Sequence, residues 1–348
     1  MQYDNLMKKC IQLANKGEGK VSPNPLVGCV VLDKNGNEIS TGYHAKYGEN
    51  HAERDALLKL KNGEEKDGTL IVNLEPCSHY GKTPPCTDLI IERGIKRVVI
   101  GMRDVNPKVN GIQKLKNAGI EVIEGVLEKE CRQLNEVFIK NMTQNKPFIA
   151  IKTAATLDGK IATQNGSSKW ITSESARAEV KKIRNRYDAI MTTSSTILAD
   201  NPTMEHRKKI ILDRELKTIS NAKIYQSGEI FVFYNGENPP PNPLPSRAGE
   251  YLDTPVINNK LDLEFIFNKA YELGIKSLLI ESGGHLNGSA LKFTDKIYHF
   301  IAPKITGDNY SKSCFDYRNI NNINDSINFK IDNIENFNPD ILLTYYPI

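Results

Sequence analysis

Two stretches in the first half of the chain decide its fold and chemistry: NHAERDALLKL at residues 50–60 and EPCSHYGKTPPC at residues 75–86. The first contains His51 at the expected start of a helix. The second contains Cys77 and Cys86, each preceded by proline and nine positions apart. Taken singly, each residue is compatible with a cap, a core position or a loop. Their combination and order favour a metal site instead.

A catalytic zinc ion takes three protein ligands and keeps its fourth position for water. His51, Cys77 and Cys86 supply that number, and both cysteines are expected before helix starts, where the dipole favours thiolate. Glu53, two positions after His51, can reach the water without binding the metal. Zinc lowers the pKa of its water to about 7. Glu53 is therefore the predicted proton carrier to a leaving amine.

Composition indicates a two-domain globular enzyme. The 348 residues are 39% apolar and 25% charged, which exceeds one typical domain length of about 150 residues. The net charge of +4 is small and not clustered, so nucleic acid and membrane partners are not expected. Six cysteines form no disulfide framework. The N-terminus predicts an amphipathic helix and no signal peptide, so a cytoplasmic location is expected.

The first half alternates strands and helices, which predicts a largely parallel sheet covered by helices. The segment at 34–38 is expected to be a turn leading to the helix from Ala52. The expected strands are residues 26–33, 68–77, 96–104 and 121–127, and the expected helices are residues 52–60, 87–95 and 110–120.

A polar stretch at 140–147 separates a second α/β region. Ser173 is expected to cap a helix over 173–187. The Pro-rich segment 238–253 is expected to be an irregular surface insertion. No repeat is visible. The expected strands are residues 148–156, 188–195, 208–216, 229–235, 276–284 and 340–348.

The H-x-E and Pro-Cys pattern resembles that of zinc-dependent nucleobase deaminases. The longer spacing between the cysteines, with SPNPLVGCVV, GYHAKYGENHAE and GMRDVNPKVNGIQKLKNAGIEVIEGVL, resembles the deaminase of the riboflavin pathway. That resemblance covers residues 1–145 and implies a cytidine-deaminase-like three-layer α/β/α domain. The substrate contacts expected there are Asn24, His44, His79 and Lys82.

The second half lacks the G-x-G-x-x-G fingerprint, although ESGGHLNGSAL offers a Gly-rich turn before a helix. KTAATLDGKIAT, SSKWITSESAR, TSSTILADNPTM and LLIESGG resemble the reductase domain of bifunctional riboflavin-synthesis enzymes. This implies a dihydrofolate-reductase-like, NADPH-dependent domain over residues 146–348. The resemblance assigns Ala154, Trp170, Thr196, Asp200, Gly283, Gly284 and His285 to the cofactor, and Lys152, Ser168, Arg184, Met204, Arg207 and Glu281 to the substrate.

Together these features predict two successive reactions on a phosphorylated pyrimidine. Zinc-dependent deamination of 2,5-diamino-6-ribosylamino-4(3H)-pyrimidinone 5′-phosphate precedes NADPH-dependent reduction of its ribosyl chain. The alternatives are a chain with an impaired reductase domain, a nucleoside or tRNA deaminase, and a regulatory protein with structural zinc. We also expect a homo-oligomer. Two departures from the family pattern are a short Thr203–Lys208 loop and Asn201 in place of aspartate.

Overall fold

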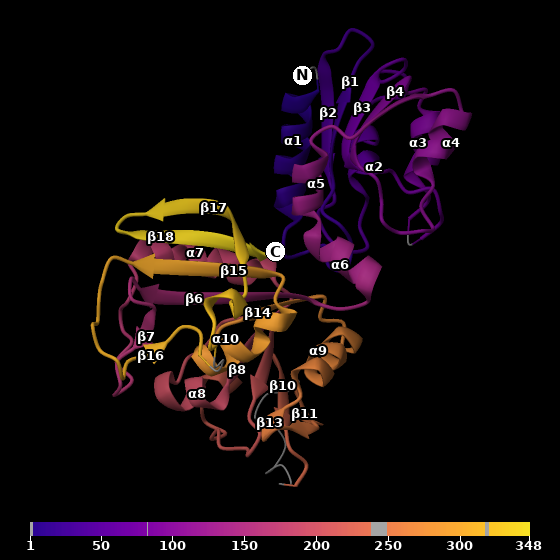
Figure 1. Ribbon diagram of the computed structural model, residues 1–348. Helices are drawn as coiled ribbons and strands as arrows, with labels where there is room; N and C mark the ends of the chain where they lie inside the picture. Colours follow the sequence, from indigo (N-terminus) through magenta and orange to yellow (C-terminus); the bar gives the residue numbers. More distant parts are fainter. Residues whose placement is uncertain (1–2, 82, 238–248, 317–319) are drawn as a thin grey trace. The chain divides into compact units, whose positions relative to one another are not determined.

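The computed structural model describes residues 3–81, 83–237, 249–316 and 320–348. The chain divides into two compact units, Met1–Asn145 and Lys146–Ile348. Figure 1 shows each unit built around its own sheet. Within the described residues, none of the helices has the length and apolar character needed to cross a membrane.

Unit 1 has a five-stranded sheet in the order β2-β1-β3-β4-β5. β3, β4 and β5 are parallel, whereas β1 is antiparallel to both of its neighbours. The expectation of a largely parallel sheet therefore holds for three strands only. The strands are β1 (Gly28–Leu32), β2 (Glu38–Tyr43), β3 (Thr69–Leu74), β4 (Arg97–Met102) and β5 (Glu121–Glu124).

Helices cover both faces of this sheet, which gives the expected three layers. In Figure 1, α1 and α5 lie on one face and α2, α3 and α4 on the other. Because both faces are covered, every residue of β1 is buried. The helices are α1 (Asp4–Ala14), α2 (Ala52–Leu57), α3 (Cys86–Glu92), α4 (Gly111–Asn117), α5 (Glu128–Leu134) and α6 (Glu136–Gln144).

Unit 2 has a nine-stranded sheet in the order β11-β10-β9-β8-β14-β6-β15-β18-β17. In this order, the strands from β11 through β15 are parallel to their neighbours. At the other end of the sheet, β18 pairs antiparallel with both β15 and β17. These strands are β6 (Phe148–Thr156), β8 (Ala189–Thr193), β9 (Lys208–Leu212), β10 (Glu229–Tyr234), β11 (Gly249–Asp253), β14 (Ser277–Ile280), β15 (Lys296–Ala302), β17 (Phe329–Phe337) and β18 (Asp340–Pro347).

In the described part of unit 2, helices accompany this sheet, and apolar cores lie on its two faces. The larger core includes side chains from α9 and α10, and the smaller includes Ile197 of α8. Ser173 caps α7, accepting a hydrogen bond from the backbone N–H of Ala176 at 3.3 Å, as the sequence predicts. The remaining elements are α7 (Glu174–Arg186), α8 (Ser194–Asp200), α9 (Leu263–Glu272), α10 (Gly284–Ala290), β7 (Lys160–Ala162), β12 (Val256–Ile257), β13 (Lys260–Leu261) and β16 (Lys312–Ser313).

The expectation of an irregular segment over 238–253 is wrong for its last five residues. Gly249–Asp253 form β11, which pairs in parallel with β10. The short segment reads as irregular because it follows a Pro-rich run and has one buried residue, Leu252. The part of that prediction at 238–248 lies outside the described residues.

Candidate active sites

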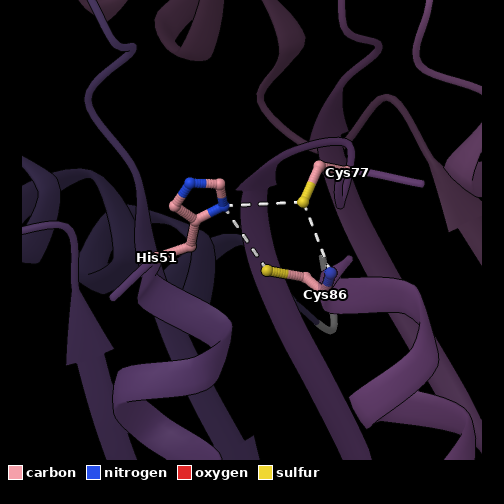
Figure 2. A group of neighbouring side chains, drawn as sticks. All are labelled: His51, Cys77 and Cys86. Atoms are coloured by element: carbon pink, nitrogen blue, oxygen red, sulfur yellow. Dashed lines mark hydrogen bonds between the residues drawn. The ribbon is translucent and has the colours of Figure 1, made fainter. Parts of the chain in front are cut away.

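Three sequence-distant side chains meet at the amino ends of two helices in unit 1. His51 immediately precedes α2, Cys86 is the first residue of α3, and Cys77 lies three positions beyond β3. Figure 2 shows both sulfur atoms turned toward the same ring nitrogen. His51 Nδ1 lies 3.5 Å from each Sγ, and the three atoms lie within 4.8 Å of one another. One nitrogen and two sulfur donors in this arrangement fit zinc.

The pKa values of the two cysteines are shifted in opposite directions. A hydrogen bond from Cys86 lowers the pKa of Cys77 to about 4 despite its partial burial. The same contact, together with burial, raises the pKa of Cys86. Cys77 also accepts a hydrogen bond from the backbone N–H of Cys86 at 3.3 Å. Both cysteines were expected at helix starts, but only Cys86 lies at one, because no helix begins directly after Cys77. The pKa of Cys77 is lowered by its contact with Cys86 instead.

Glu53 is buried beside this cluster, with 3% of its surface exposed. Burial, followed by the nearby Cys77 charge, raises the pKa of Glu53 to about 7. Its carboxyl group can therefore exchange a proton near neutral pH, as general acid–base chemistry requires. Glu53, His51 and Cys77 all line one cavity of about 240 Å³.

Three of the four expected substrate residues of unit 1 line the same cavity, namely Asn24, His44 and His79. His44 Nδ1 lies 2.9 Å from the carbonyl oxygen of Asn50, and its Nε2 lies 3.1 Å from the Asn24 amide nitrogen. Burial lowers the pKa of His44. A neutral ring that donates through Nδ1 and accepts from Asn24 satisfies both contacts.

The structure describes His79 but not Lys82. His79 carries a buried Nδ1 for which no hydrogen-bond partner is found among the described residues. Because buried polar atoms are normally paired, this atom is suited to a ligand. Lys82 lies outside the described residues.

Several cavity residues were not predicted from the sequence, among them two polar residues after β4. Asp104 and Asn106 follow the carboxyl end of β4 and line the cavity. Burial raises the pKa of Asp104 to about 6, while a hydrogen bond from the Asn106 N–H opposes this shift. The available signal was their position, because loops after parallel strands are the usual site of ligand contacts.

In unit 2, three of the predicted substrate residues form one buried ion network. Arg184 of α7 donates twice to Glu281, through Nε at 2.6 Å and Nη2 at 2.9 Å. Lys152 of β6 lies 2.8 Å from the same carboxylate. Burial alone would raise the pKa of Glu281, but the charges of Lys152 and Arg184 outweigh it and lower the pKa to about 2. Arg184 is therefore not a solvated helix charge.

The predicted cofactor turn lies where β14 ends. Gly283 has open space where a Cβ would stand, so a ligand can approach its backbone closely. The hydroxyl groups of Thr193, Thr196 and Ser282 lie within 3.4 Å of one another beside this turn. An open glycine backbone next to hydroxyl donors fits a phosphate-bearing cofactor.

The other predicted cofactor residues near this turn differ in their surroundings. Gly284 packs tightly against the carbonyl oxygen of Ser313. His285 is exposed, with Nδ1 3.4 Å from Asp316. Ala154 is partly exposed on β6.

The other predicted reductase residues lie on nearby loops and are not all exposed. Trp170 is 65% exposed and is therefore not a core residue. The guanidinium carbon of Arg177 lies over its ring, 4.3 Å from the ring centre. Ser168 reaches Asp200 at 3.5 Å. Met204 is buried in the smaller core, whereas Arg207 is exposed.

The departure at Asn201 has a local physical explanation. Asn201 ends α8 with a φ of 41°, a left-handed conformation that asparagine tolerates well. Its side-chain oxygen accepts a hydrogen bond from the backbone N–H of Lys223 at 2.9 Å. Asparagine at this position therefore stabilises the helix end.

The layers of unit 1, the His–Cys–Cys cluster and the buried glutamate define a zinc-dependent deaminase of the cytidine deaminase class, joined to a second α/β unit. Residues 1–102 match the cytidine and deoxycytidylate deaminase zinc-binding region. Residues 147–343 match the RibD C-terminal domain. The chain belongs to the family of the riboflavin biosynthesis protein RibD.

Relatives match the chain across both units. The riboflavin biosynthesis protein RibD of Actinobacillus pleuropneumoniae is 40% identical over 358 residues, covering 98% of this chain and 94% of that protein. RibD of Aquifex aeolicus is 41% identical, covering 98% and 97%.

Two solved structures share the fold of the whole chain. A diaminohydroxyphosphoribosylaminopyrimidine deaminase/5-amino-6-(5-phosphoribosylamino)uracil reductase of Thermotoga maritima is 40% identical, covers 99% of each chain and has a TM-score of 0.87. RibD of Acinetobacter baumannii is 32% identical, covers 100% of this chain and 99% of its own, and has a TM-score of 0.88.

These matches confirm the cytidine-deaminase-like and dihydrofolate-reductase-like folds. The chain is a bifunctional enzyme of riboflavin biosynthesis, with a zinc-dependent deaminase and an NADPH-dependent reductase. Its substrates are small phosphorylated pyrimidines.

Proposed function

We propose that unit 1 deaminates 2,5-diamino-6-ribosylamino-4(3H)-pyrimidinone 5′-phosphate and that unit 2 then reduces the ribosyl chain to ribityl. The observation that carries this proposal is the cavity shared by His51, Cys77 and Glu53. The activities of the Thermotoga maritima relative, which matches along nearly the whole chain, support the order and the substrate.

In the deaminase step, His51, Cys77 and Cys86 hold zinc, and Glu53 moves the proton. Zinc, when bound, supplies the Lewis acidity that brings the pKa of water near neutrality. With a pKa of about 7, Glu53 accepts a proton and delivers it to the leaving amine. Water and the amino-substituted carbon thus yield a carbonyl group and ammonia.

Asn24, His44 and His79 orient the pyrimidine in the cavity. The carbonyl oxygen of Asn50 fixes the proton of His44 on Nδ1, so His44 Nε2 accepts from the Asn24 amide nitrogen. That contact turns the Asn24 side-chain oxygen outward as an acceptor for a ring N–H or amino group. The Nδ1 of His79, which has no hydrogen-bond partner among the described residues, offers a further contact. We assign the phosphate to Lys82, from the family resemblance.

In the reductase step, NADPH would supply the hydride, and the residues that would hold it are Gly283, Gly284, His285, Thr196, Asp200, Ala154 and Trp170. The residues that hold the substrate are Lys152, Ser168, Arg184, Met204, Arg207 and Glu281. Glu281 fixes both cationic groups of Lys152 and Arg184 in one network, so they are oriented before the sugar arrives. Buried Met204 acts by shaping the loop that presents Arg207.

We also propose that the enzyme works in the cytoplasm as a homo-oligomer, without nucleic acid partners. The six cysteines all lie in the described residues and form no disulfide bond, which suits a reducing compartment. The small net charge of +4 argues against a polyanionic partner.

Zinc removal and reconstitution test the deaminase assignment. The chelated protein should lose ammonia release and regain it with one zinc per chain. Its NADPH oxidation, measured with the already deaminated substrate, should remain unchanged. Ammonia release that persists in zinc-free protein contradicts the proposal.

A further inference from the structure

The buried carboxylate of Glu75 holds both ends of the loop that forms one cavity wall. Glu75 is 7% exposed and lies two positions before Cys77. Its Oε2 accepts from the backbone N–H of Asp104 at 3.2 Å, and its Oε1 accepts from that of Ile112 at 2.9 Å. Asp104 begins the loop and Ile112 lies in the first turn of α4. One side chain therefore closes the loop of residues 104–112.

The residues on either side of Cys77, Pro76 and Ser78, also contact the start of α4. The hydroxyl oxygen of Ser78 accepts from the backbone N–H of Asn110 at 2.8 Å. A Cβ on Gly111 would stand 2.0 Å from the carbonyl oxygen of Pro76, so this contact requires glycine. Residues immediately before and after Cys77 are thus fixed against the start of α4.

We call these contacts of Glu75, Ser78 and Gly111 the brace. The brace joins two parts of the deaminase site. Cys77 is one of the three clustered metal donors, while Asp104 and Asn106 line the cavity. Charge-assisted hydrogen bonds from backbone N–H groups to a buried carboxylate are stronger than neutral ones and well suited to fix a loop. Small displacements of positioning groups reduce rates by large factors.

We infer that Glu75 is a positioning residue that fixes Cys77 and the Asp104–Asn106 wall relative to each other for the deaminase reaction. The inference rests on the proposed function of unit 1. Glu75 itself does not touch the three clustered donors through any contact found in the described residues. It acts through the backbone on either side of it.

Glu65 provides a matched control within the same unit. It is also a fully buried carboxylate, paired with Arg93 at 2.6 Å. Arg93 donates in addition to the carbonyl oxygen of Leu57 at 2.8 Å, at the carboxyl end of α2, away from the His51 end. Loss of this pair should affect stability alone.

The test compares Glu75→Gln and Glu65→Gln in the full chain, loaded with zinc for kinetics and with cobalt for spectroscopy. Glu75→Gln leaves one acceptor and sets an amide N–H₂ against a backbone N–H. We expect its deaminase kcat/KM to fall about 10- to 100-fold, as for partners that orient metal ligands. The sulfur-to-cobalt absorption bands should shift. Glu65→Gln should lower the unfolding temperature and leave the cobalt bands and deaminase kcat/KM unchanged.

The outcomes separate this inference from the proposed function. If wild-type protein releases no ammonia, the proposed function fails. If wild type is active and folded Glu75→Gln retains its bands and kcat/KM, the positioning role is wrong. If Glu75→Gln does not fold, Ser78→Ala decides: a several-fold loss of kcat/KM with shifted bands supports the brace, and wild-type values for both refute it.

Discussion

The two candidate sites of this chain differ in how their polar groups are paired. In the deaminase unit, His51, Cys77 and Glu53 face a common cavity, and His79 keeps a buried nitrogen without a partner among the described residues. In the reductase unit, the single carboxylate of Glu281 pairs with both Lys152 and Arg184. The first site is assembled to receive a metal and a neutral ring. The second holds its cations on a carboxylate, and in the proposed function these cations bind the anionic substrate.

The largest expected effect comes from Glu53→Gln, which removes the proton carrier and keeps the side-chain shape. We expect ammonia release to fall about 10²- to 10⁴-fold, with zinc content unchanged. NADPH oxidation with deaminated substrate should stay at the wild-type rate. Retained ammonia release would contradict a catalytic site and favour a structural metal.

A smaller effect is expected from Arg184→Ala, which breaks the bidentate contact to Glu281. The remaining buried carboxylate keeps only Lys152 as a cationic partner within this network. We expect reductase kcat/KM to fall about 10- to 100-fold, because the substrate loses one positioned cationic group and Glu281 loses one of its two cationic partners. Lys181→Ala, an exposed charge on the same helix, is the control and should have wild-type kinetics.

The Glu281 network also predicts a pH dependence of the stability of unit 2. The pKa of Glu281 is lowered from 4.5 to about 2 in the folded protein. Its contribution to stability is therefore complete above pH 4.5 and lost as the pH falls toward 2. Denaturant unfolding of wild type and Glu281→Gln should differ most at neutral pH and converge in acid. A constant difference across this range would contradict the pairing.

The smallest effect is expected from His299, a half-buried residue of β15 packed near Phe315 and Tyr345. Burial lowers its pKa from 6.5 to about 4, so its contribution is complete above pH 6.5 and lost toward pH 4. His299→Phe should flatten the stability profile between these values and leave the Glu281 range unchanged. Identical slopes for both proteins would show that His299 titrates normally.

The sequence predicts most strands of the two large sheets and misses four of those in the described residues. β2, β11 and β17 lie at the edges of their sheets, whereas β15 lies inside its sheet, between β6 and β18. β17 is exposed along most of its length. An edge strand buries little surface, so it lacks the apolar pattern by which strands are recognised.

The same contrast applies to the site residues. The three metal donors were predictable because their residue types and spacing are specific to zinc chemistry. Asp104 and Asn106 were missed because aspartate and asparagine are common in turns. The Arg184–Glu281 contact joins residues 97 positions apart, and no local pattern indicates such a pairing.

The most direct test of the account is a paired assay on the zinc-loaded full chain with the diaminopyrimidine ribosyl phosphate. Ammonia release and NADPH oxidation are followed separately in one reaction. The account predicts ammonia first, followed by one NADPH oxidised for each ammonia released. Ammonia without NADPH oxidation would contradict a working reductase, and neither signal from folded, zinc-loaded protein would contradict the bifunctional assignment.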